Sequence, residues 1–148
     1  MPRHSTLVPL SHDHHEALLI ALRLKKGGPT SQHDRLWPAD PEQQVRSLLL
    51  FYERELLPHF KIEEDILFPA ASSLPELEET IKDLIAQHQR MREKIAHISI
   101  IRYEIDLKKE LADFGALLES HVRMEERRLF PILEEAETEG RIILPQLK

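Results

Sequence analysis

The sequence predicts an all-α fold, an up-down-up-down bundle of four helices in a single domain that spans residues 1–148. Two observations carry this prediction. Glycine is scarce, at 4 of 148 residues, and 31% of the residues are charged, a composition that suits helices. Four stretches also place apolar residues at every third or fourth position, which is the spacing of one face of an α-helix.

The first predicted helix covers about residues 11–26. Ser11 or Asp13 can cap its N-terminus, and the Gly-Gly-Pro run at residues 27–29 ends it. The connection that follows is the only long one. We expect Trp37, within that connection, to fold onto the bundle.

The second predicted helix opens with a strong start signal. Asp40 is a good N-cap, Pro41 is tolerated at the first helical position, and Gln43 completes a capping box. Pro58 lies inside the helix, and we expect it to kink the helix rather than end it, because the apolar row resumes beyond it. That row consists of Val45, Leu48, Leu49, Tyr52 and Leu56, and it continues onto His59, Glu63 and Leu67.

Two further helices complete the bundle. The third starts near Pro75, and the fourth begins somewhere between Ser99 and Asp106, where no glycine or proline marks the turn. Short connections make consecutive helices antiparallel, so helices two and four run parallel, as do one and three. The third apolar row is Ile81, Leu84, Ile85, His88, Met91, Ile95 and Ile98, and the fourth is Leu107, Leu111, Phe114, Leu118, His121, Glu125 and Leu129.

An eleven-residue block occurs twice in the chain. Residues 59–69 read HFKIEEDILFP and residues 121–131 read HVRMEERRLFP, at an offset of 62 residues. In each block a histidine is followed four residues later by a glutamate. On a helix these two side chains lie on the same face, about 6 Å apart along the axis. The repeat therefore predicts an approximate two-fold axis, with a site for metal ions on that axis.

The apolar rows select the candidate ligands, because a histidine replaces an apolar residue in three of them. The first helix offers several histidines, and we favour His15 over His14. Apolar Leu18 and Leu22 follow His15 at the spacing seen after His88, whereas only alanines follow His14. The predicted metal ligands are His15, His59, Glu63, His88, His121 and Glu125.

This donor set predicts a pair of transition-metal ions. Two inward-facing carboxylates need cations, and the apolar rows supply no lysine or arginine at those positions. The chain has no cysteine, so no thiolate can contribute. Imidazole-rich sites disfavour magnesium and calcium, whereas iron suits them, and manganese and zinc remain open. Six donors leave two ions under-coordinated, so water, hydroxide or a small ligand must complete the shells.

Other residues near the predicted site receive structural interpretations. Glu64 and Glu126 lie 100° round the helix from the ligand glutamates, and we expect them to face solvent or an interface. The alternative is that each holds the ring N–H of a ligand histidine. The repeated Leu-Phe-Pro is interpreted as core packing with a helix kink. Tyr52 is interpreted as a core residue, the alternative being that it lines the site.

The bulk properties exclude several partners. A net charge of −6 argues against nucleic acid, and no apolar run approaches the 18 residues of a membrane span. The first residues lack the apolar segment of a signal peptide, so we expect a cytoplasmic protein. The sequence leaves open a homodimer formed through Ile142, Ile143 and Leu144.

The residues singled out above resemble the hemerythrin-like HHE cation-binding family over about residues 7–136. The resemblance is carried by LSHDHHEAL at residues 10–18, by the two H-x-x-x-E-E-x-x-L-F-P blocks and by the lone His88. It implies a four-helix bundle with a non-haem di-iron site, whose ions are bridged by carboxylates and by an oxo or hydroxo group. It also implies a small ligand such as O2, NO or peroxide.

This sequence departs from the oxygen-carrying hemerythrins at two positions. Arg92 stands where they have a second histidine on the third helix. Their last histidine is followed five residues later by an aspartate, where this chain has His121 and, four residues later, Glu125. With one ligand missing, the resemblance then implies that one iron has a more open coordination shell. The set of four histidines and two glutamates is similar to the bundle of the repair-of-iron-centres di-iron proteins, which are linked to nitric oxide and oxidative stress.

Three hypotheses for function follow. The first is a di-iron protein that binds or processes the small ligand. The second is an iron- or oxygen-responsive sensor or iron-handling interaction domain without turnover. The third is a metal-free bundle whose histidines form a polar core.

Overall fold

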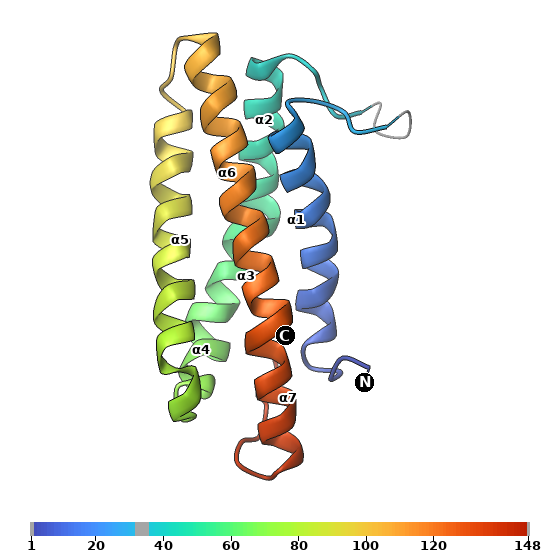
Figure 1. Cartoon of the computed structure of the whole chain (residues 1–148), viewed down its shortest axis with the longest axis vertical. Coiled ribbons are helices and arrows are strands. Elements are labelled where there is room, and N and C mark those ends of the chain that lie inside the picture. Colours follow the sequence, from blue (N-terminus) through green and yellow to red (C-terminus); the bar gives the residue numbers. More distant parts are fainter. Residues whose placement is uncertain (1, 32–35, 148) are drawn as a thin grey trace.

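The four predicted helices form an up-down-up-down bundle in the computed structural model, which describes residues 2–31 and 36–147 (Figure 1). The first helix is α1 (Val8–Lys26). The third is α5 (Glu78–Ile98), preceded by the 3₁₀ turn η4 (Pro75–Leu77). The second is built from α2 (Pro41–Phe51), η2 (Tyr52–Leu56), α3 (Leu57–Ile62), η3 (Glu63–Leu67) and α4 (Phe68–Ala71). The fourth is built from α6 (Glu104–Met124), η5 (Glu125–Leu129) and α7 (Phe130–Thr138).

The arrangement confirms the predicted all-α class and topology. No strand occurs among the described residues. None of the helices in that part of the chain combines the length and apolar character that a bilayer crossing needs. The start of the fourth helix falls inside the predicted interval. The first helix begins earlier than predicted, because Ser11 already donates its backbone N–H to Leu7 O at 3.0 Å.

The helix ends follow the predicted signals at two places. Asp40 is the N-cap of α2, and its Oδ2 accepts the backbone N–H of Gln43 at 3.1 Å. Gly27 ends α1 with a φ of 88°, a left-handed conformation that glycine adopts without steric cost.

Three π-helical turns, η2, η3 and η5, carry the second and fourth helices past prolines. Each turn starts six residues before Pro58, Pro69 or Pro131. Proline has no backbone N–H to donate, and its ring clashes with the carbonyl four residues earlier. A π turn, in which an N–H reaches five residues back, widens the helix at that point, as where Phe68 donates to Glu63 O. The helices therefore continue through these prolines, and two of the three π turns begin at Glu63 and Glu125.

Helices α1 and α6 pack unusually closely. A Cβ atom added to Gly115 of α6 would lie 2.7 Å from the backbone oxygen of Ala21 in α1. Ala17 and Ala21 are both buried on this side of α1. Small side chains on both helices thus allow the close approach and determine which face of α1 is turned inward.

Apolar side chains form two clusters, one on each side of the middle of the bundle. The cluster around the C-terminal half of α1 includes Phe60 and Phe114 and also Trp37, which folds onto the bundle as expected. The cluster around the start of α1 includes Leu129 and Leu144 from the C-terminal part of the chain. Leu144 is therefore buried in its own chain and not free for a dimer contact, whereas Ile143 is 88% exposed.

Candidate metal centre

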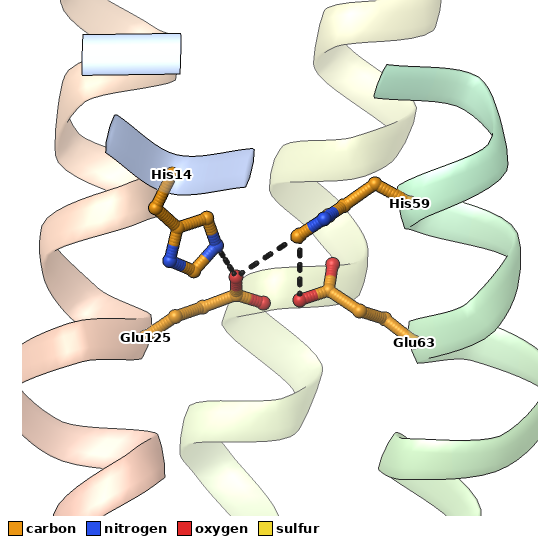
Figure 2. Close-up of side chains that lie close together, drawn as sticks. All are labelled: His14, His59, Glu63 and Glu125. Carbon is orange, nitrogen blue, oxygen red and sulfur yellow. Dashed lines mark ion pairs between the residues drawn. The ribbon is translucent and has the colours of Figure 1, made fainter. Parts of the chain in front are cut away.

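Six buried polar side chains from all four long helices meet between the two apolar clusters. Each is at most 3% exposed. Figure 2 shows four of them converging, with two imidazoles above two carboxylates. The six residues are His14, His59, Glu63, His88, His121 and Glu125.

These side chains form two overlapping groups of potential ligands. In each group, one ligand atom per residue lies within 4.8 Å of all the others. Glu63 and Glu125 belong to both groups. One group adds His14 and His59, and the other adds His88 and His121. The arrangement therefore brings together two adjacent groups of potential metal ligands that share two carboxylates.

The Nε2 atoms of the histidines point at these carboxylates. His14 Nε2 lies 2.8 Å from Glu125 Oε1, and His59 Nε2 lies 3.3 Å from Glu63 Oε2. In the other group, His88 Nε2 lies 3.1 Å from Glu63 Oε1 and 3.1 Å from His121 Nε2. Nitrogen and oxygen donors thus lie close together, and no described lysine or arginine neutralises the two carboxylates. Within the described residues, all ion pairs of Glu63 and Glu125 are with histidines.

The Nδ1 atom of every one of these histidines contacts an oxygen outside the centre. His14 pairs with Glu126 at 2.7 Å and His88 with Glu64 at 2.6 Å. His59 pairs with Asp13 at 3.0 Å, and His121 pairs with the amide oxygen of Gln87 at 2.7 Å.

A carboxylate or amide oxygen can only accept, so each ring donates its Nδ1–H outward. In the neutral imidazole, the unprotonated Nε2 lone pair then points into the centre, as metal coordination requires.

Glu64 and Glu126 correct one prediction. They are only 27% and 26% exposed rather than solvated, and each accepts the ring N–H of a histidine on a neighbouring helix. Arg92 donates to Glu64 at 2.8 Å, and Arg3 donates to Glu126 at 3.0 Å. The alternative interpretation of these glutamates, as partners of ligand histidines, is therefore the one the structure supports.

The preference for His15 over His14 is wrong. His15 lies on the exposed side of α1, whereas His14 is buried at the centre. The alanines that follow His14 lie on the close-packed face of α1, while Leu22 is 49% exposed. Close helix packing selects small side chains here, so the larger apolar residues marked the wrong face. The structure brings together the other five predicted ligands, with His14 as the sixth.

Tyr52 is half-buried and packs edge-on against Phe60, with ring centroids 6.5 Å apart. It does not line the cavity beside the centre. This position fits its interpretation as a packing residue.

The charges of the centre are coupled. Burial opposes ionisation of Glu63, but the nearby His59 and several hydrogen bonds hold the pKa of Glu63 well below its usual range. Burial likewise lowers the pKa of His14, yet the adjacent carboxylates of Glu125 and Glu126 outweigh it and raise that pKa to about 9. Ionised carboxylates in this interior thus require positive charge, which protons on the rings or bound cations can supply.

Several buried ligand atoms, although close to one another, make no well-directed hydrogen bond to any residue that the structure describes. Native proteins rarely leave buried polar atoms unpaired, and a cation would satisfy all of these at once. Their clustering at one point, with imidazole nitrogen and carboxylate oxygen mixed, fits a transition metal. The atoms are His14 Nε2, His59 Nε2, Glu63 Oε2, Glu125 Oε1 and Glu125 Oε2.

A small cavity adjoins the centre on the side of His14 and His59. Its volume is about 10 Å³, room for about one water-sized molecule. Its other walls are mainly apolar. The lining residues are Asp13, His14, Ala17, Phe51, Glu55, Leu56, His59, Phe60, Leu118, His121 and Val122.

Comparison with protein families agrees with this geometry. The family model of the hemerythrin HHE cation-binding domain matches residues 6–136. The chain therefore belongs to the hemerythrin HHE cation-binding domain family, as the resemblance of its motifs predicted. Comparison with curated proteins and with solved structures found no match.

Proposed function

We propose that this chain is a non-haem di-iron protein that binds or processes O2, NO or peroxide at a carboxylate-bridged site. The observation that carries the proposal is the sharing of Glu63 and Glu125 between two histidine-containing groups. A single ion would need only one such group. Shared carboxylates are the arrangement by which helical bundles hold two ions side by side.

The donor set supports iron as the metal. His14 and His59 would hold one ion, His88 and His121 the other, and Glu63 and Glu125 would contact both. Iron accepts this mixture of imidazole and carboxylate, and manganese and zinc compete for the same ligands. Bound iron would supply open coordination positions and electrons to a small ligand.

The protein itself supplies selection and orientation. The cavity beside His14 and His59 has room for about one water-sized molecule, which restricts the ligand to a small one such as a diatomic molecule or peroxide. Its apolar walls, including Leu56 and Leu118, limit access of bulk water. The outward hydrogen bonds of the four rings hold each imidazole in place, so ligand binding does not require the rings to rearrange.

The proposal is tested by adding ferrous iron to the metal-free protein under anaerobic conditions. The loaded protein is then exposed separately to O2, NO and peroxide while its optical spectrum is recorded. We expect new charge-transfer bands with at least one of these ligands. Multiple turnovers per iron pair would identify an enzyme, and one stoichiometric event a binding protein. An iron-loaded protein whose spectrum responds to none of them would contradict the proposal.

A second candidate is a sensor or interaction domain without turnover. It is favoured by the position of the unpaired ligand atoms, which lie on three of the four long helices and would lose their shared partner when metal leaves. It predicts that chelation lowers helicity or protease resistance, whereas unchanged melting on chelation would exclude it.

A further inference from the structure

The two halves of the centre correspond in one pair of their outer hydrogen bonds. Glu64 and Glu126 occupy the same place in the repeated block, and each accepts the ring N–H of the histidine on the adjacent helix. Arg92 pairs with the first and Arg3 with the second. In this pair of contacts each metal position therefore has one carboxylate paired with an arginine, and Ser11 additionally donates to Glu126 at 2.7 Å.

The second pair of contacts breaks the correspondence. Asp13 precedes His14 in the chain, and Gln87 precedes His88. Asp13 Oδ2 accepts from His59 Nδ1 at 3.0 Å, and Gln87 Oε1 accepts in the same way from His121 Nδ1 at 2.7 Å. Both oxygens accept the ring N–H, but one belongs to a carboxylate and the other to a neutral amide.

This difference bears on how each position holds a cation. A carboxylate that accepts a ring N–H makes the imidazole a stronger base and adds a negative charge near the ion. The position of His14 and His59 has two such carboxylates, Glu126 and Asp13. The position of His88 and His121 has one, Glu64. The side chain of Asp13 is 41% exposed, so water screens part of its charge but leaves its direct contact with the ring.

We propose that Asp13 and Gln87 are positioning residues that make the two metal positions unequal. The position of His14 and His59 binds its ion first and more tightly, and the position of His88 and His121 binds second. This inference rests on the proposed function, because it requires a centre of two ions. The cavity is lined by both histidines of the tighter position and by His121 alone of the other, so the more firmly held ion has the larger share of the space for a small ligand.

Cobalt(II) titration of the metal-free full chain tests the proposal, with paramagnetic proton NMR to follow the ring N–H signals. In the native protein we expect two binding steps, with two shifted ring N–H signals from the first equivalent. Asp13→Asn keeps an oxygen acceptor for His59 and removes only the charge. It should weaken the tighter step by about tenfold to a hundredfold, the usual effect of a partner of a metal ligand. It should also move one of the two signals of the first equivalent.

Gln87→Glu supplies the reciprocal change. It should strengthen the weaker step by about tenfold and move one of the signals that appear with the second equivalent. A residue with a merely structural role would not improve binding when replaced. Glu16→Gln is the matched control, since it removes a carboxylate from the exposed side of α1 without touching a ring. Both of its steps should remain native.

The inference would be overturned by a second step at least as tight as the first, by an Asp13→Asn effect confined to the weaker step, or by a Gln87→Glu chain that binds cobalt less tightly. A native chain that binds fewer than two cobalt ions would instead contradict the proposed function itself. Two cobalt ions with unaltered constants in both variants would leave that function intact and remove only the inequality.

Discussion

Raising the pH should destabilise the metal-free protein. Without cations, the carboxylates of the centre depend on protonated rings, among them His14, whose pKa is about 9 against an ordinary 6.5. A raised folded-state pKa stabilises the fold fully below 6.5, and this contribution is lost as the pH rises towards 9. The gap corresponds to on the order of 3 kcal/mol. The pKa of His59 is raised well above 6.5, so its contribution has the same sign.

Urea denaturation of the chelator-treated protein at pH 6 and pH 9, followed by circular dichroism, measures this effect. The free energy of unfolding should fall by on the order of 3 kcal/mol between the two. A zinc-loaded sample should not show this loss, because the ions replace the ring protons. The stability gap between loaded and metal-free protein should therefore widen with pH.

A His15→Gln variant serves as the control, because His15 is exposed and should leave the pH dependence native. Metal-free protein that is equally stable or more stable at pH 9 would refute the reasoning. It would show that the carboxylates of the centre are not balanced by protons on the rings.

Three other predictions concern single substitutions. His14→Ala should reduce the iron bound per chain, whereas His15→Ala should leave it unchanged, as measured by metal analysis after anaerobic loading. Glu125→Ala should abolish the metal pair while much of the helicity remains, because both positions share this carboxylate; retention of two irons would show that it does not bridge. Gly115→Ala should cost about 1–3 kcal/mol of unfolding free energy in urea, since the new methyl group meets Ala21 O at 2.7 Å, with no change in iron content.

The repeated block made most of the centre predictable from sequence. A histidine and a glutamate four residues apart share one helix face, and both copies continue an apolar row. A charged residue in such a row must be buried, so Glu63 and Glu125 were marked as inward-facing without a structure. His88 was recognisable in the same way, as the one polar interruption of its row.

The histidine that the first helix contributes was harder to predict, because this helix carries no copy of the repeated block and has a weak apolar face. The choice between His14 and His15 depended on which side of α1 meets α6. Gly115 and the alanines of α1 set that side through close backbone approach, a property that apolar periodicity does not report.

The residues that accept the outward ring N–H groups could not be predicted from single helices, because these contacts depend on how the helices pack. Glu64 and Glu126 look solvated on an isolated helix, and only a neighbouring helix supplies the ring each one contacts. The duplication of both adjacent glutamates was the available signal. Asp13 and Gln87 each directly precede a histidine of the centre. This shared pattern is recognisable only once His14 is known to lie at the centre.

Anomalous diffraction at the iron absorption edge, from crystals of the anaerobically iron-loaded chain, tests the central claim most directly. The account predicts two anomalous peaks, one beside His14 and His59 and one beside His88 and His121, both within coordination distance of Glu63 and Glu125. Crystals of the loaded chain with no peak among these side chains, or with a single peak that touches only one of the glutamates, would contradict it.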